Sequence, residues 1–417
     1  MRVVMLTDDI MIDRRILQEA ETLRGKGHEV ILLAGWQEGL SEYELINGIK
    51  VHRVKSTNQA LWFIPILLIQ SLLIRIINLC AKFLYTFFSL TIRVLQKVIG
   101  LETVDHEILE KALFYDGDVY HSHDLPSLLA GCKAAKKLGV PFIYDAHELY
   151  PEIHTLTLHQ QRRLSKLERK WIKRADVVIT VNEFIAEEMG KRYKIALPKV
   201  ILNAAQAEIG FDPENQKSIF RERFSIDLNE KIVIFHGWMA EGRGLDKLVR
   251  SMRLLDRHIH LVLMGYGDYR EVLERLCHEV NSEDRIHFLD AVPQSELLYY
   301  ISSADAGIIP YEPVDLNHQL CSPNKLFEFI QAGIPIIAND LPFLRKIIEG
   351  EEIGIVRKLE DEASYAEAIR AMFSSTEKFR YYKKNILGLS DIYCWDVEGK
   401  RLLEIYQQLL EQWEVRH

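Results

Sequence analysis

Hydrophobic residues along the chain form short apolar runs that alternate with stretches of helical spacing. The run at residues 3–7 suits a buried parallel strand, residues 13–26 carry apolar positions at helical spacing, and residues 29–33 form the next apolar run. The same alternation returns at residues 118–121 and continues to residues 200–203. This order of strand, helix and strand predicts a parallel sheet flanked by helices.

A second series of the same kind begins beyond residue 230. Its apolar runs lie at residues 232–235, 260–264, 286–289, 306–309 and 334–338. The polar stretch 204–230 lacks strong strand patterns and is typical of a linker between domains. We therefore predict an α/β protein with two Rossmann-like, doubly wound domains. They span residues 1–205 and 206–390, and a helix in residues 391–417 packs back toward the first domain.

Residues 60–99 break this rhythm, because neither glycine nor proline occurs from residue 66 to residue 99. The polar positions share one narrow stripe of a helical wheel, and they are Ser71, Arg75, Asn78, Lys82, Thr86, Ser89, Arg93, Gln96 and Lys97. A wide apolar face with a cationic stripe is typical of a helix lying in a membrane interface. We expect residues 60–99 to bind an anionic membrane surface without spanning it, since spanning needs about 20 apolar residues. A helix packed on its own domain or on a dimer partner is the alternative.

Composition narrows the class of protein further. The 417 residues carry a formal net charge of −8 at pH 7, which argues against a general nucleic-acid binder. The five cysteines are scattered without the paired spacing of a zinc ribbon, as is typical of a reducing compartment. The N-terminus runs straight into a strand-like segment and lacks the pattern of a secretory signal. We expect a cytoplasmic protein.

The stretch that begins at Ser322 combines a helix start, a helix stop and a buried strand. Ser322 suits the N-cap, Pro323 suits the first helical position, and Gly333 suits a left-handed helix end. Lys325 lies in the first turn, where the helix dipole disfavours a cation, so an anion sharing the site would explain it. Glu328 lies about a turn further on, where its carboxylate could accept hydrogen bonds from two ribose hydroxyls. A surface helix with no bound ligand is the alternative.

Distinctive residues also follow the predicted strands at their carboxyl ends, where ligands of open parallel sheets bind. They are His123, Asp124, His147, Glu148, Gly237 and Gly265. Two domains that face each other across a cleft would aim these residues inward. His121, His123, Asp124 and His147 could ligate a metal, but no matching cluster accompanies them, and we expect no metal site. His121 lies on a strand, where a histidine is more often a satisfied core residue than a ligand.

The sequence resembles the family 4 glycosyltransferases of the two-domain GT-B fold over nearly its whole length. The matching pieces are residues 13–23, 27–30, 121–124, 144–148, 237–244, 265–267 and 322–338. This resemblance implies a nucleotide diphosphate sugar as co-substrate, no other cofactor, no bound metal, and retention of the anomeric configuration. It also implies that the two domains are an acceptor-side domain followed by a donor-side domain.

The resemblance implies a role for each matched residue. Glu328 would hold the donor ribose, Arg243 would grip the donor diphosphate, and His123 would lie near the transferred sugar. The other donor-binding residues would be Gly237, Gly265, Ser322, Pro323 and Asn324. The acceptor-side residues would be Asp13, Arg14, His147 and Glu148.

Two positions depart from the family pattern. Residue 320 is Leu where the first glutamate of the paired motif is expected, and residue 238 is Trp where a basic residue is expected. Lys325 can restore the missing positive charge at the helix terminus where a diphosphate would lie. Arg243 and Lys325 would then stabilise the leaving diphosphate, and His123 would hydrogen-bond the sugar or relay a proton.

Together these features predict a hexosyltransferase-type enzyme located in the cytoplasm, peripheral on the inner face of the plasma membrane. It would transfer a sugar to a lipid-linked or glycan acceptor in bacterial surface polysaccharide synthesis. A GT-B nucleotide-sugar epimerase and a non-catalytic homologue that scaffolds a partner are the alternatives. The donor sugar and base, the acceptor, the linkage and the oligomeric state stay open.

Overall fold

The computed structural model describes residues 1–55, 106–206, 210–214 and 218–416. The amphipathic stretch 60–99 lies outside these residues. The chain forms two compact units, of which the first contains Met1–His147, Ser165–Ile179 and Ile405–His417, and the second contains Glu148–Leu164 and Thr180–Glu404. The domain boundaries proposed at residues 205 and 390 stay predictions. No helix in the described part of the chain is both long enough and apolar enough to cross a bilayer.

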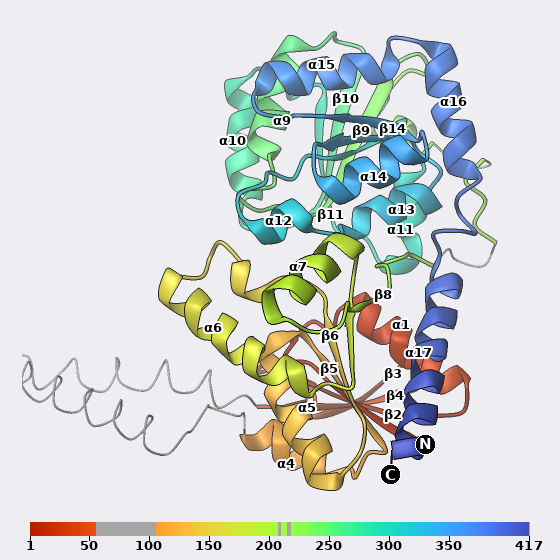
Figure 1. The fold of residues 1–417 in the computed structure, drawn as a ribbon. Coiled ribbons are helices and arrows are strands. Elements are labelled where there is room, and N and C mark those ends of the chain that lie inside the picture. Colours follow the sequence, from red (N-terminus) through yellow and green to blue (C-terminus); the bar gives the residue numbers. More distant parts are fainter. Residues whose placement is uncertain (56–105, 207–209, 215–217, 417) are drawn as a thin grey trace, which may run out of the picture. The chain divides into compact units, whose positions relative to one another are not determined.

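The first sheet has eight strands in the order β3-β4-β2-β1-β5-β6-β7-β8 (Figure 1). The strands are β1 (Arg2–Leu6), β2 (Glu29–Gly35), β3 (Tyr43–Ile46), β4 (Ile49–Val54), β5 (Val119–His123), β6 (Phe142–Ala146), β7 (Val177–Thr180) and β8 (Lys199–Val200). The pairings of β1, β2, β4, β5 and β6 are parallel, and β3 runs antiparallel to β4. Every residue of β5 and β6 is buried, as expected for strands covered on both faces.

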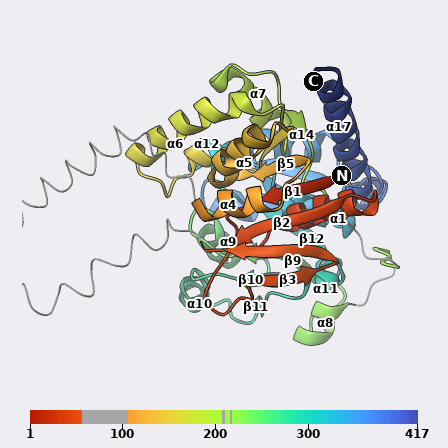
Figure 2. The same ribbon diagram turned by 90° about the horizontal axis from the view of Figure 1, so that it is seen from below.

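Helices follow the strands of this sheet. They are α1 (Arg14–Gly25), α4 (His106–Phe114), α5 (Asp124–Leu138), α6 (Leu158–Trp171) and α7 (Glu183–Tyr193), with 3₁₀ turns at Tyr150–Glu152 (η1) and Ile172–Arg174 (η2). α1 packs on β2, and α5 packs on β5 and β6. α4 and α5 lie side by side in both views (Figures 1 and 2).

The second sheet is parallel, with six strands in the order β11-β10-β9-β12-β13-β14. The strands are β9 (Lys231–Trp238), β10 (Ile259–Tyr266), β11 (Ile286–Asp290), β12 (Ala306–Ile309), β13 (Ile336–Asn339) and β14 (Gly354–Arg357). The helices are α8 (Ile219–Phe224), α9 (Leu245–Ser251), η3 (Met252–Leu254), α10 (Arg270–Glu279), α11 (Gln294–Ile301), α12 (Leu316–Leu320), α13 (Asn324–Gln331), α14 (Pro342–Gly350), α15 (Glu362–Phe373), α16 (Thr376–Leu387) and α17 (Trp395–Arg416).

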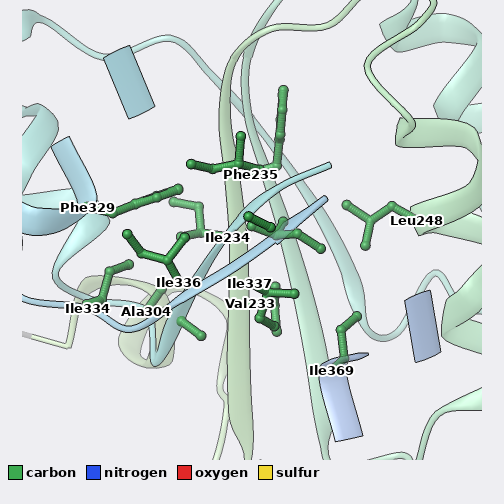
Figure 3. Packing of buried hydrophobic residues seen from close by; sticks show 14 of the residues in the cluster. Val233, Ile234, Phe235, Leu248, Ala304, Phe329, Ile334, Ile336, Ile337 and Ile369 are labelled. Atoms are coloured by element: carbon green, nitrogen blue, oxygen red, sulfur yellow. The ribbon is translucent and has the colours of Figure 1, made fainter. Parts of the chain in front are cut away.

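Helices cover both faces of the second sheet. Figure 3 shows Phe329 of α13 on one side of the central strands and Leu248 of α9 on the other. Both side chains are fully buried, and burying one of this size stabilises the fold by about 1.5–3 kcal/mol. Gly307 of β12 makes room for Phe329, since a Cβ at residue 307 would lie 2.6 Å from that ring. The absence of one side chain thus allows the other to pack.

Two parallel-rich sheets with flanking helices confirm the predicted fold class. At α13 the predicted end is confirmed and the predicted start is wrong by one residue. Gly333 has a φ of 67° and lies just past the helix end, as predicted. The N-cap is Pro323 in an extended conformation, so Ser322 lies outside the helix and does not cap it. Within the predicted linker 204–230, residues 219–224 form the short helix α8.

Candidate functional site

Lys325 is a buried cation in the first turn of α13. Its side chain is 8% exposed, and its Nζ donates a hydrogen bond of 2.8 Å to the Tyr311 hydroxyl. The ammonium also lies 4.9 Å from the centroid of the Phe235 ring. No carboxylate lies within ion-pair distance of it among the residues that the structure describes. Burying a charge without a counter-ion is costly, and here the hydrogen bond and the aromatic ring offset part of that cost.

Arg243 shares an aromatic neighbour with Lys325. The Cζ atom of Arg243 lies 3.9 Å from the Tyr311 ring centroid, and Lys325 Nζ lies 5.2 Å from the same centroid. Arg243 Cζ is also 6.0 Å from the Trp238 ring, whose side chain is 53% exposed. The ring of Tyr311 therefore gathers both cations at one place. Two clustered cations suit a multiply charged anion such as a diphosphate.

Two glycines at the ends of β9 and β10 make space beside Lys325. Gly237 has a φ of 98°, and a Cβ there would lie 3.0 Å from Lys325 Nζ. Gly265 has a φ of 151°, and a Cβ there would lie 2.0 Å from the Gly237 carbonyl oxygen. Both conformations favour glycine, and the second position has no room for any side chain. The backbones of β9 and β10 therefore approach each other closely at this place.

The N-terminus of α13 offers uncapped backbone donors. Its N-cap, Pro323, makes no side-chain hydrogen bond to the helix, so the first N–H groups lack the usual partner. Ser322 is 7% exposed, and its Oγ has no hydrogen-bond partner in the described part of the chain. Asn203 Nδ2 donates to the Ser322 carbonyl oxygen at 3.2 Å, and Asn182 Nδ2 donates to that of Leu320 at 2.8 Å. These two hydrogen bonds hold the loop in place, while the Ser322 hydroxyl keeps its hydrogen-bonding capacity for a ligand at the helix N-terminus.

Glu328 lies one turn deeper in α13 and is 6% exposed. Its Oε2 lies 3.4 Å from Nε2 of His236, a residue of β9. The structure therefore brings the predicted ribose ligand into the same unit as Lys325 and Arg243. Leu320 ends α12 and Trp238 ends β9, and neither supplies a charge.

His123 is fully buried at the end of β5, in the first unit. Its Nδ1 lies 3.2 Å from Nε2 of His147, and its ring stacks on that of His121 with 4.3 Å between centroids. Its Nε2 has no hydrogen-bond partner among the described residues. Burial and the two neighbouring imidazoles lower the pKa of His123 well below its ordinary value. The neutral ring therefore has one nitrogen ready for a ligand.

A buried charge network supports these histidines. Arg15 donates to Asp145 Oδ2 at 2.8 Å and lies 3.0 Å from Glu19 Oε1. Burial alone would raise the pKa of Asp145, but the Arg15 guanidinium and the surrounding imidazoles hold it well below its ordinary value. Burial and the Asp145 carboxylate raise the pKa of Glu19 well above its ordinary value. Glu19 is thus the neutral partner and Asp145 the charged one.

His121 connects this network to the C-terminal helix. Its Nδ1 lies 2.9 Å from the Tyr406 hydroxyl of α17, and its Nε2 lies 4.0 Å from Asp145 Oδ2. Burial lowers the pKa of His121 to about 4. His121 is therefore a core residue that Tyr406 holds at one nitrogen, and its Nε2 has no hydrogen-bond partner among the described residues. Glu19, His121, His123 and Asp145 come close enough to hold a metal ion, but the Arg15 guanidinium already supplies the positive charge among them.

The predicted acceptor-side residues differ in their surroundings. Asp13 is the N-cap of α1 and accepts from the Arg15 backbone N–H at 2.7 Å, and Arg14 is half-buried. His147 donates its backbone N–H to Asp124 Oδ1 at 2.8 Å, which holds the ring near His123. Asp124 has a φ of 59°, a strained value that recurs at functional sites.

Glu148 belongs to the second unit. Its Oε2 accepts from Asn317 Nδ2 at 2.8 Å, and Asn317 Oδ1 accepts from the Leu149 backbone N–H at 3.0 Å. Asn317 thus fixes this carboxylate against α12. The structure groups Asp13, Arg14, His123 and His147 in the first unit and the remaining predicted site residues in the second.

Two family models match the chain. Residues 95–206 match Glycosyltransferase Family 4, and residues 216–387 match Glycosyl transferases group 1. The chain belongs to the family 4 glycosyltransferases. The second match contains β9 to α13 and hence Lys325, Arg243 and Glu328, and the first contains His123 and His147.

Relatives of this glycosyltransferase span its whole length. An uncharacterized glycosyltransferase of Methanocaldococcus jannaschii is 26% identical over 411 residues, which cover 94% of this chain and 93% of the relative. Sucrose-phosphate synthase from Thermosynechococcus elongatus has a TM-score of 0.71 at 18% identity, over 99% of both chains. HepE of Anabaena, solved in complex with UDP and glucose, has a TM-score of 0.71 at 13% identity, over 98% of this chain and 100% of its own. These likenesses confirm the predicted GT-B fold.

Several residues of the glycosyltransferase's site were not predicted from the sequence. One is Tyr311, whose ring contacts both Lys325 and Arg243. Another is His236, which faces Glu328. Both come from other elements than their partners. Arg15, the neighbour of the predicted Arg14, is the arginine that reaches the histidine cluster. The signals in the sequence were its place in the family-matching piece 13–23 and its position at the start of a helix after the first strand.

Proposed function

We propose that this glycosyltransferase transfers a hexose from a nucleotide diphosphate sugar to a lipid-linked or glycan acceptor. The reaction takes place at the cytoplasmic face of the plasma membrane and serves bacterial surface polysaccharide synthesis. It retains the anomeric configuration and needs no metal ion. The observation that carries the proposal is the buried Lys325 ammonium, which has no carboxylate partner in the described part of the chain and lies at an uncapped helix N-terminus.

The donor diphosphate explains that arrangement. Its oxygens would accept from Lys325, from Arg243 and from the first N–H groups of α13, and Ser322 Oγ would gain the partner that it lacks. As the glycosidic bond to the diphosphate breaks, negative charge grows on the leaving oxygen. Fixed cations at that point stabilise the transition state more than the ground state. Glu328 would accept from the ribose hydroxyls.

His123 is proposed to contact the sugar. Its neutral imidazole has an unpartnered Nε2, which suits a hydrogen bond to a sugar hydroxyl. His147 sets the orientation of the ring through the contact at Nδ1. Support for a nucleotide sugar as donor also comes from HepE, which has been solved with UDP-glucose.

The membrane-bound acceptor is inferred from the amphipathic pattern of residues 60–99. A variant with Arg75, Lys82, Arg93 and Lys97 changed to glutamate reverses the charge of the cationic stripe. We expect the wild-type protein to float with vesicles that contain anionic phospholipid and the variant to stay at the bottom of the gradient. Neutral vesicles provide the control. Equal flotation of both proteins, or none with either, would rule out this surface.

The donor assignment is tested by screening nucleotide sugars for release of the nucleoside diphosphate. Arg243→Ala and Glu328→Ala should each lower turnover of the active donor by about 100-fold or more while the protein stays folded. Arg250→Ala, which changes an arginine of α9 paired with Glu279, is the matched control and should keep wild-type turnover. Undiminished turnover in either site variant contradicts the assignment.

A non-catalytic scaffold is the competing function, because Leu320 and Trp238 stand where the family has charged residues. Thermal unfolding with a panel of nucleoside diphosphates separates the two. A ligand of the native state must raise the melting temperature, so a shift with one nucleotide supports the enzyme. No shift with any nucleotide supports the scaffold. An epimerase would release free nucleotide or convert the donor sugar in the absence of any acceptor.

A further inference from the structure

Three potential metal ligands meet in the second unit, outside the residues assigned to the donor. His154 follows the turn η1, Asp315 is the N-cap of α12, and His318 lies inside α12. One ligand atom from each of the three lies within 4.8 Å of the others. His154 is separated from the other two by more than 150 residues of sequence, so the fold brings them together.

The Asp315 carboxylate is held between the two histidines. Its Oδ1 accepts the His318 backbone N–H at 2.6 Å and lies 3.0 Å from Nδ1 of the same residue. Its Oδ2 accepts the His154 backbone N–H at 2.8 Å and lies 3.2 Å from His154 Nδ1. The two backbone donors fix the orientation of the carboxylate. Each oxygen therefore presents a remaining lone pair to one imidazole nitrogen.

Each of these close contacts needs a hydrogen atom or a metal ion between the oxygen and the nitrogen. A neutral imidazole protonated at Nε2 has a lone pair at Nδ1, which would repel the carboxylate oxygen. Either a proton on each Nδ1 or one shared cation removes that repulsion. Zinc bonds of about 2.0–2.1 Å in a tetrahedron place neighbouring ligand atoms about 3.3 Å apart. The two distances of 3.0 and 3.2 Å are close to that spacing.

We propose that His154, Asp315 and His318 bind one divalent transition-metal ion of the zinc type. Imidazole nitrogens select such ions over Mg²⁺ and Ca²⁺, which prefer oxygen ligands alone. The His154 side chain is 40% exposed, so solvent can reach the fourth position, and the carboxylate is 9% exposed. The ion would tether the segment after η1 to α12, the helix that leads into Ser322. It would act as a structural clamp beside the donor residues.

The test uses the full chain without an affinity tag, stripped of metal and dialysed against ZnCl₂. We expect one Zn²⁺ per chain, retained in excess Mg²⁺. Removing a residue that only hydrogen-bonds to a metal ligand typically lowers metal affinity by about 10- to 100-fold. His154 is a proposed ligand itself, so His154→Ala should weaken Zn²⁺ binding by about that factor or more. His318→Ala should do the same. His159→Ala, which removes an exposed histidine five residues from His154, should bind as the wild type does.

Co²⁺ provides a second measurement on the same proteins. The absorption spectrum of bound Co²⁺ reports a low-coordinate site with nitrogen ligands. This spectrum should be lost in His154→Ala. The His154 side chain is 40% exposed, so its removal should leave the fold intact. The site is refuted if the wild-type protein retains no Zn²⁺ at micromolar concentrations. It is also refuted if both histidine variants bind as the wild type does, because the ion then lies elsewhere. In either case the three residues form a hydrogen-bonded triad with a proton on each Nδ1.

Discussion

Replacing Lys325 by methionine should lower turnover strongly and change the stability of the same protein only slightly. Methionine has a similar length and no branching, so it can fill the space of the lysine stem without its charge. The two effects have separate origins in the structure. Turnover depends on the ammonium that faces the proposed diphosphate, and stability depends on the burial of that ammonium beside Tyr311 and Phe235.

The effect on turnover follows from the charge on the leaving group. Unit charges 4 Å apart interact with about 4 kcal/mol at an effective dielectric constant of 20. Removing one fixed donor from a developing oxyanion typically costs about 10²–10³ in kcat. These two estimates agree, since 4 kcal/mol corresponds to nearly three orders of magnitude. We expect kcat of Lys325→Met to fall by about 100- to 1000-fold.

The effect on stability is small, because opposing terms offset each other. Desolvating an ammonium costs several kcal/mol, and in this protein the described residues provide no carboxylate to offset it. The hydrogen bond to Tyr311 returns about 1.5–3 kcal/mol, and each aromatic ring returns about 0.5–2 kcal/mol. Methionine also leaves the Tyr311 hydroxyl without this donor, so the opposing terms nearly cancel and the free energy of unfolding should change by less than about 2 kcal/mol. For a unit of this size the melting temperature should therefore shift by less than about 8 °C.

The assay measures both quantities on matched proteins. Single-turnover release of the nucleoside diphosphate gives the rate of the chemical step, and thermal unfolding with and without UDP gives stability and ligand binding. Lys346→Met serves as control, because Lys346 is 56% exposed and pairs with Glu183 on the surface. It should change turnover less than twofold. A Lys325→Met protein that keeps at least a third of its turnover would refute a catalytic role for the ammonium.

Two further predictions concern the missing family cation and the buried histidines. Adding Trp238→Arg to Lys325→Met should recover about 10-fold or more of the lost turnover, because the exposed residue 238 can carry the charge that the family places there. No recovery in single-turnover assays would show that residues 238 and 325 are not equivalent positions for this charge. The free energy of unfolding should fall as the pH drops from about 6.5 toward 4. Burial lowers the pKa of His121 to about 4 in the folded protein, so in this pH range the unfolded chain binds more protons than the folded one. In His121→Gln the melting temperature should fall less steeply over this range than in the wild type, and identical slopes would contradict the burial argument.

The features of α13 and its flanking residues were largely predictable, because they lie in one continuous stretch of sequence. The helix start within one residue, the left-handed Gly333, and the positions of Lys325 and Glu328 all depend on local backbone chemistry. The error at the N-cap has a local cause as well. Ser322 and Pro323 both tolerate an extended backbone, and only the packing of the loop decides which of them precedes the helix.

The partners of these residues were not predictable, because they come from distant strands and loops. Tyr311 follows β12, and its place between Lys325 and Arg243 depends on the order of the strands in the sheet. The sequence shows only a tyrosine after an apolar run. The choice of Arg15 over Arg14 depends on which face of α1 meets the buried Asp145. Helical spacing identifies a face but cannot tell which carboxylate lies opposite.

The proposed metal ligands illustrate the same limit. Sequence spacing reveals metal ligands when they are close together, and His318 lies only three residues from Asp315, which is too common a pair to indicate a site. The third residue, His154, is brought to them by the hydrogen bonds that the Asp315 carboxylate accepts from two separate backbone segments. The same segment places Asn317 against Glu148 and leads into Ser322. α12 therefore links the candidate metal ligands to the loop that carries Ser322.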